Sequence, residues 1–191
     1  MTSFFQLTPQ WIQFDQFWIS LKKRNYWLIQ LRYGAVLMFI MFIAAFEFIP
    51  QLEIDSRPLS VVCAAILVYN IAFHRIVRYL PDKMAKFHGL HFALIQIIAD
   101  FIALLLFVYY TGGIDTPFYI FFLFHIIIGS LILPGRVVSM IIVTTLIITL
   151  GGALLELNGY IPHHHISGLL DVCLHENVAY LVFHFVIFGL S

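Results

Sequence analysis

The chain has 191 residues, of which 62% are hydrophobic and 10% are charged, and its mean hydropathy is +0.97. This composition lies far from that of a soluble domain and indicates an integral membrane protein. Ten basic residues balance ten acidic ones, and the placement of these charges says more than their sum. We expect no nucleic-acid partner.

Residues 1–30 are expected to be cytoplasmic and to contain a helix lying in the membrane interface. Apolar side chains recur there at helical spacing, a pattern typical of such helices: Trp11, Phe14, Trp18 and Leu21. We do not expect a cleaved signal peptide, because the basic cluster follows these residues and no small-residue cleavage site precedes the first span.

Residues 31–191 are expected to form an all-α, six-helix transmembrane bundle. Five apolar segments are long enough to cross a hydrocarbon core of about 30 Å, which needs about 20 helical residues. They are 33–50, 59–76, 90–110, 117–134 and 136–157. A sixth segment, 177–191, is still apolar at Ser191. At about 15 residues this segment is too short to span the membrane, so we expect that the sequence is either cut there or ends unusually early.

The basic residues predict how the chain crosses the membrane. Nine of the ten fall on the cytoplasmic side if the N-terminus is cytoplasmic, and only Arg57 falls outside. This asymmetry is the one that the positive-inside rule describes. We expect a multi-pass protein with a cytoplasmic N-terminus, whose loops around Gly112 and His164 face outward.

Three ionisable residues on different spans are expected at similar depth in the outer half of the membrane: Asp100, His125 and His184. At about 1.5 Å per residue they lie about 15, 12 and 10 Å from the outer ends of their spans. Because ionisable side chains in a membrane usually face the bundle interior, we expect one shared site for a ligand, a proton or a metal ion. The alternative is three separate structural hydrogen bonds.

Further polar side chains flank this expected site. Gln96 lies one helical turn before Asp100 and shares its face. In the fifth span a small and polar stripe at helical spacing would allow close helix approach and put Glu156 near the outer mouth. The stripe consists of Thr145, Thr149, Gly152 and Glu156.

The loop after the fifth span carries three consecutive histidines. If this segment is extended, His163 and His165 point the same way, and both are then candidate metal ligands. A solvated loop is the alternative. The two cysteines, Cys63 and Cys173, lie in no CxxC motif, and a disulfide between them is one option on the oxidising outer side.

The sequence TGGIDTPF, residues 111–118, precedes the fourth span. Gly112 and Gly113 permit a tight turn and close backbone approach. Thr116 and Pro117 have the pattern of a helix N-cap and first helical residue. The free N–H groups of that helix start would suit a carbonyl or anionic oxygen. A well-made chain reversal is the alternative.

From Asp100 to Gly168 the chain resembles the membrane domain of bacterial sensor histidine kinases of the multi-span, redox-responsive type. The resemblance rests on TGGIDTPF, FFLFHIIIGSLIL and GGALLELNGYIPHHH. In that family the loop reads GGxxNPF and is associated with quinone; Gly112, Gly113, Pro117 and Phe118 match it, and Thr116 stands where the family has Asn. The resemblance implies a homodimer in the bacterial inner membrane that acts on a cytoplasmic response regulator through a kinase region outside these 191 residues.

These observations favour a sensory membrane domain that binds a small hydrophobic or redox-active ligand, such as a quinone, or a metal ion. We find no catalytic motif in the chain. Whether the whole protein is an enzyme depends on that further region. The alternative function is a redox subunit that ligates b-type haem through His125 and His184. A transporter or proton relay through Asp100 is weaker, because no span is interrupted at mid-membrane.

Overall fold

The computed structural model describes residues 15–48, 55–79 and 82–164, together with the single residues 179, 182 and 186. All regular elements in this part of the chain are helical, which confirms the expected all-α membrane fold. The elements are α1 (Asp15–Glu47), α2 (Ser56–Tyr79), α3 (Asp82–Tyr110), the 3₁₀ turns η1 (Gly113–Asp115) and η2 (Pro117–Tyr119), α4 (Ile120–Ile132) and α5 (Gly135–Leu157).

Four of these helices contain segments long and apolar enough to cross a membrane. The segments are Ser20–Ala45, Ser56–Tyr79, Gly89–Tyr110 and Gly135–Leu157. Their exposed surfaces are covered with large apolar side chains, as lipid-facing helices require. Examples are Met41, Val68 and Ile147.

The first helix differs from the sequence-based expectation. Helix α1 continues without a break from Asp15 to Glu47, across the expected boundary at residue 30 between an interfacial helix and a span beginning at residue 33. No glycine or proline interrupts α1 before Gly34. Trp11 and Phe14 lie outside the described residues.

The fourth apolar segment begins differently from the expected helix 117–134. Its first residues form η2, and α4 itself has 13 residues, or about 20 Å at 1.5 Å per residue. Helix α4 is therefore shorter than a full span, and η1 and η2 occupy the remaining depth beside the end of α3. Of the expected sixth span only Ala179, Val182 and Val186 are described, and all three are helical.

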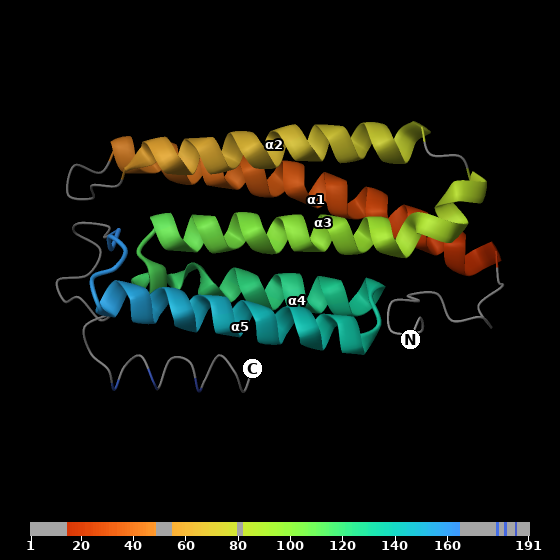
Figure 1. Cartoon of the computed structure of the whole chain (residues 1–191). Helices are drawn as coiled ribbons and strands as arrows, with labels where there is room; N and C mark the ends of the chain where they lie inside the picture. The colour runs from red at the N-terminus through yellow and green to blue at the C-terminus, as the bar shows by residue number, and fades with distance from the viewer. Residues whose placement is uncertain are drawn as a thin grey trace.

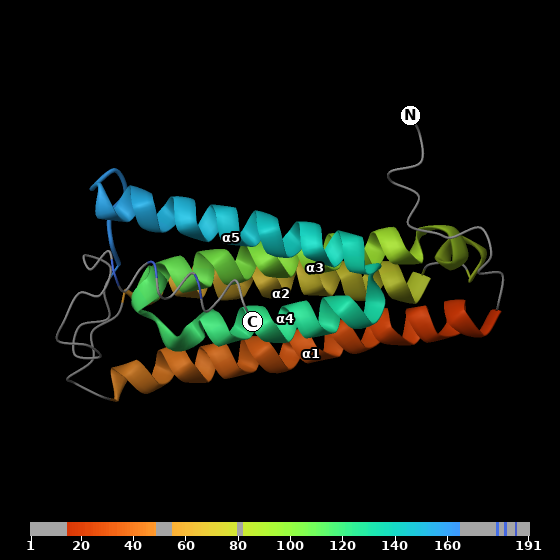
Figure 2. The same ribbon diagram turned by 90° about the horizontal axis from the view of Figure 1, so that it is seen from below.

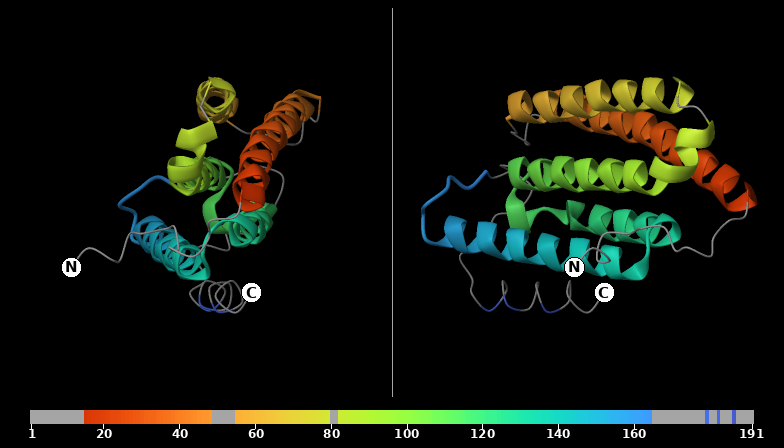
Figure 3. Two further views of the ribbon diagram at one scale, coloured as in Figure 1. Left: turned by 90° about the vertical axis from the view of Figure 1, so that its right-hand side faces the viewer. Right: turned by 45° about the vertical axis from the view of Figure 1, so that its right-hand side comes forward.

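Helix α3 is the centre of the bundle. It contacts α1 and α2 on one side and α4 and α5 on the other, and Figure 1 shows it between these two pairs. Figure 2 and the end-on view in Figure 3 show the helices running side by side as a bundle. Buried residues of α3 join both hydrophobic cores, with Leu104 in one and Phe107 in the other.

The two ends of the bundle are unlike each other. At the left end in Figure 1, the turn from α3 into α4 lies beside the chain leaving α5. We call this the loop end; it contains residues 111–119 and 158–164. The opposite end contains the start of α1 and the end of α2.

Candidate functional site

Asp100 on α3 forms a buried ion pair with Arg32 on α1. Arg32 Nε donates to Asp100 Oδ1 at 2.6 Å, and Arg32 Nη2 donates to Asp100 Oδ2 at 2.8 Å. Both residues are buried, at 5% and 7% exposure respectively. Two parallel hydrogen bonds between a guanidinium and a carboxylate are the strongest ion-pair geometry in proteins. Each charged side chain therefore has an oppositely charged partner inside the bundle.

Four further side chains surround this pair, and with it they form what we call the central polar network. They are Asn25 on α1, Tyr69 and Asn70 on α2, and Gln96 on α3.

Hydrogen bonds connect these side chains across the three helices. Tyr69 donates its hydroxyl proton to Asp100 Oδ1 at 2.9 Å, and Arg32 Nη1 donates to Gln96 Oε1 at 2.7 Å. Gln96 Nε2 donates to Asn25 Oδ1 at 3.0 Å. The shared face predicted for Gln96 and Asp100 is confirmed, because both bind Arg32. A network satisfied in this way specifies one packing of α1, α2 and α3.

Sequence reasoning missed Arg32 as the partner of Asp100. It treated Arg32 as a cytoplasmic charge at the start of the first span, whereas the residue lies well inside the apolar segment Ser20–Ala45. The apolar residues on both sides of Arg32, and the need of Asp100 for a partner, were the available signals.

His125 on α4 shares a cavity with the ion pair. This cavity of about 310 Å³ is lined by residues of α1, α2, α3 and α4, and Asp100, Tyr69 and His125 are among them. His125 Nδ1 lies 2.8 Å from the carbonyl oxygen of Phe121. The structure thus brings Asp100 and His125 to one cavity, while His184 lies outside the described residues.

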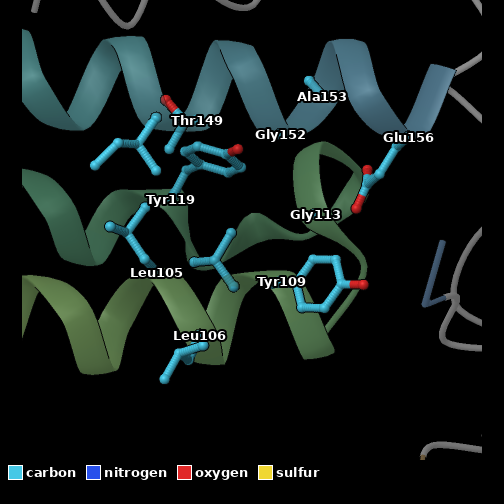
Figure 4. Close-up of a pocket in the computed structure, with 11 residues that line it drawn as sticks. Leu105, Leu106, Tyr109, Gly113, Tyr119, Thr149, Gly152, Ala153 and Glu156 are labelled. Atoms are coloured by element: carbon cyan, nitrogen blue, oxygen red, sulfur yellow. The ribbon is translucent and has the colours of Figure 1, made fainter. Parts of the chain in front are cut away.

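A second cavity, of about 190 Å³, lies at the loop end and is called the loop-end cavity below. Figure 4 shows Thr149, Gly152 and Glu156 of α5 facing Leu105 and Tyr109 of α3 across it. Thr145 is also buried, and the hydroxyl of Thr149 donates to its carbonyl oxygen at 2.9 Å. The predicted polar stripe on α5 therefore faces the bundle interior.

The glycine pair supplies one edge of this cavity. Gly112 and Gly113 have φ angles of 116° and 56°. Residues other than glycine rarely adopt this backbone conformation. A Cβ added to Gly113 would lie 2.9 Å from Glu156 Oε2. The turn thus brings backbone directly against a buried carboxylate, and this close approach requires glycine.

The residues that follow the glycine pair do not begin an α-helix directly. The amide of Phe118 donates to Thr116 Oγ1 at 3.5 Å, so Thr116 caps the 3₁₀ turn η2, which starts at Pro117, and α4 begins at Ile120. The ring of Phe118 packs against Phe42 and Phe107 in the apolar interior. The residues of the motif therefore shape the turn that closes the cavity.

His163 joins the two loops at this end. Its Nε2 lies 3.4 Å from Asp115 Oδ2, and its Nδ1 lies 3.5 Å from Glu156 Oε2. Hydrogen bonds to Asp115 and to Glu156 raise the pKa of His163 from 6.5 to about 9, although burial opposes the increase. We call Gly113, Asp115, Glu156 and His163 the loop cluster.

Of the loop cluster, sequence reasoning named all except Asp115, which it treated only as part of a turn.

The neighbouring histidines have other surroundings. His164 packs its ring against Tyr109 and Tyr110 at 4.9 and 5.1 Å between centroids, and His165 lies outside the described residues. Within the part of the chain that the structure describes, no three His, Cys, Asp or Glu side chains are grouped to hold a metal ion. Cys63 is free and buried, and Cys173 is not described.

Comparison with known protein families identifies a related membrane domain. Residues 15–188 match a family model described as the PilS-like transmembrane domain, a six-span (6TM) unit. No curated protein and no solved structure matches significantly. Because the family match covers most of the sequence, the chain belongs to the family of PilS-like transmembrane domains.

Proposed function

We propose that the chain is the signal-input domain of a sensor histidine kinase in the bacterial inner membrane. The observation that carries the proposal is the match of residues 15–188 to the PilS-like domain, because PilS is a sensor histidine kinase. In this proposal the loop end faces outward and the N-terminus is cytoplasmic, as the basic residues predict. A kinase region of the same protein acts as a homodimer on a cytoplasmic response regulator.

The loop-end cavity is the ligand site in this proposal. Its walls are mainly apolar, with Glu156 and the Tyr109 ring beside the Gly113 turn. Small-molecule sites usually combine such walls with a few polar groups. Glu156 is only 7% exposed, so a ligand that replaced its present contacts would gain interactions in a dry environment.

The size and mouth of the cavity limit the class of ligand. A volume of about 190 Å³ is below the range of about 300–1,000 Å³ that holds a whole drug-sized molecule. Leu106 and Ile148 line the cavity and are 43% and 50% exposed, as residues of apolar, membrane-length helices that would face lipid. These features suit the polar ring of a lipid-soluble molecule, such as a quinone, whose tail remains in the bilayer.

Signal transmission needs only a shift between two packings of the bundle. The cavity is bounded by α3, by the turns before α4 and by α5, so an occupant changes the contacts of α5. A ligand that prefers one packing by about 1.4 kcal/mol changes the ratio of the two states tenfold.

A redox subunit with b-type haem or a metal ion remains the second candidate. It is favoured by the contact between His125 Nδ1 and the Phe121 carbonyl oxygen, because histidine ligands commonly use one ring nitrogen in this way while the other binds the metal. His184 would be the second ligand. Asp100 is less suited to join them, since its oxygens already accept hydrogen bonds from Arg32 and Tyr69.

Phosphorylation tests the kinase assignment. Membranes containing the full-length gene product should incorporate the γ-phosphate of labelled ATP into that protein. Absence of any label, in membranes where the protein is intact, would contradict it.

An absorption spectrum of the purified protein with a reducible haem band, lost in His125→Ala, would establish the second candidate instead.

A matched pair of variants tests the cavity. Gly152 lines it, whereas Gly151 does not, and a Cβ at either position meets nothing within 4 Å. Gly152→Leu should fill the cavity and abolish saturable binding of a short-chain quinone, while Gly151→Leu should leave binding unchanged. Equal binding by both variants would show that the ligand does not bind in this cavity. The kinase assignment would not be affected.

A further inference from the structure

A basic pocket lies at the end of the bundle opposite the loop cluster, between α1 and α2. It has a volume of about 470 Å³. Its lining residues are Lys22, Lys23, Tyr26, His74, Val77 and Arg78. Three of these six are cationic, and two of them, Lys23 and Arg78, are exposed and present positive charge at the pocket.

The position of the pocket coincides with the ends of two membrane-crossing segments. Lys22 and Lys23 follow the start of Ser20–Ala45, and Arg78 is one residue from the end of Ser56–Tyr79. Helices α1 and α2 lie side by side along the bundle, with the first residues of α1 and the last residues of α2 at the same end (Figure 1). The pocket therefore lies at the depth of lipid headgroups and not in the hydrocarbon core.

The wall of the pocket is held in place by aromatic contacts. The hydroxyl of Tyr33 lies 3.4 Å from His74 Nδ1. The ring of Tyr26 meets the His74 ring edge-on, with 5.6 Å between centroids. These contacts join α1 to α2 directly beneath the cations, so the cations surround a defined recess.

An apolar strip continues from the pocket toward the membrane interior. On α2, Leu67 and Ile71 precede His74 and Arg78 at spacings of three and four residues, which puts all four on one face of the helix. Leu67 and Ile71 are exposed. A phosphate group in the pocket would therefore have apolar surface along the path of its acyl chains.

We propose that this pocket binds the phosphate headgroup of an anionic phospholipid, whose acyl chains lie along Leu67 and Ile71. Lys and Arg side chains near an anionic membrane surface each contribute about 1 kcal/mol to the attraction. Exposed ammonium and guanidinium groups can also contact a phosphate without becoming buried. A bound lipid would contact α1 and α2 together, the two helices joined to α3 by the central polar network. The inference does not depend on the proposed kinase function.

Binding of defined lipids tests the proposal. The purified chain in a neutral detergent is titrated with phosphatidylglycerol, or with phosphatidylcholine of the same acyl chains, and bound lipids are counted by native mass spectrometry. Lys23→Gln combined with Arg78→Gln should weaken phosphatidylglycerol binding about thirtyfold, from about 1 kcal/mol for each cation removed. Phosphatidylcholine should bind weakly to every variant.

Two controls keep the test decisive. Arg136→Gln removes an exposed cation from the first turn of α5, outside the pocket, and should leave lipid binding unchanged. Lys23→Arg with Arg78→Lys keeps both charges and should retain binding, even if the glutamine variant folds poorly. An equal loss in Arg136→Gln, or equal binding of phosphatidylcholine, would overturn the proposal. Displacement of the lipid by an equal concentration of inorganic phosphate would identify a free-anion site instead and would also overturn it.

Discussion

The central polar network and the loop cluster both place carboxylates inside a membrane protein, but they balance charge differently. In the network one guanidinium meets one carboxylate through two short hydrogen bonds. In the loop cluster one imidazole lies between two carboxylates at 3.4 and 3.5 Å. The first arrangement pairs one positive group with one negative group. The second depends on a proton on His163 to attract the two carboxylates.

This difference indicates separate roles for the two regions. Breaking the network leaves an uncompensated buried charge, so it acts as a fixed joint between α1, α2 and α3. The loop cluster joins residues 113–115 to residues 156–163 by contacts that a proton or a ligand can replace. We expect changes in packing to begin at the loop cluster while the network holds its geometry.

The largest expected effect is at the network. Asp100→Ala leaves Arg32 buried without its partner and should lower the free energy of unfolding by about 3–5 kcal/mol. Arg32→Met combined with Asp100→Leu removes both charges and should cost clearly less. Detergent-titration unfolding of the purified chain measures both. A loss for Asp100→Ala within the surface range of about 0.5 kcal/mol would mean that the pair is not a fixed joint.

The next largest effect is at the glycine turn. Gly113→Ala puts a Cβ 2.9 Å from Glu156 Oε2 on a residue with φ of 56° and should destabilise the fold by about 1–2 kcal/mol. Gly151→Ala, inside α5 with nothing within 4 Å of its Cβ, should instead stabilise it by about 0.5–1 kcal/mol. The same unfolding titration compares the two. Equal shifts of one sign would show that the contact with Glu156 does not matter.

The pH dependence of the loop cluster follows from His163. Its pKa is raised above the unfolded value, so its contribution to stability is fully present below pH 6.5 and is lost as the pH rises through about 9. The unfolding midpoint should fall across this window in the unaltered chain. In His163→Gln this part of the pH dependence should disappear, and its persistence would assign the effect to another group.

The smallest effect is expected at the edge of the loop end. The hydroxyl of Tyr109 donates to the Pro162 carbonyl oxygen at 3.0 Å, and Tyr109→Phe should cost about 0.5–1.5 kcal/mol. Tyr160, which is 79% exposed, provides the control, since Tyr160→Phe should have almost no effect. If the hydrogen bond of Tyr109 stabilises the loop, thermal unfolding in detergent should give a lower midpoint for Tyr109→Phe than for Tyr160→Phe.

Sequence patterns revealed the elements with regular spacing. The apolar segments predicted most of α2, α3 and α5, and helical periodicity predicted the stripe from Thr145 to Glu156. These features depend on neighbours along one helix, whose geometry is known in advance.

The pairings between elements could not be obtained in this way. A basic residue near the start of an apolar segment, such as Arg32, can extend toward the headgroups or turn inward, and only the position of α3 decides between them. Asp115 and His163 meet because two irregular loops converge, and no periodicity relates them. The two cavities likewise divide residues that the sequence had assigned to one site.

Distances between spin labels test most directly the claim that the loop end moves while the network holds. Cysteines replace the exposed Phe48, which directly follows α1, and the exposed Tyr160 of the loop end, in a chain whose own cysteines are replaced by alanine. They report the distance between the end of α1 and the loop end. Cysteines at the exposed Val68 and Ile102 report on the helices of the network. Raising the pH from below 6.5 to above 9 should change the first distance and leave the second unchanged, and His163→Gln should abolish the change. A constant first distance, or an equal change in both, would contradict the account.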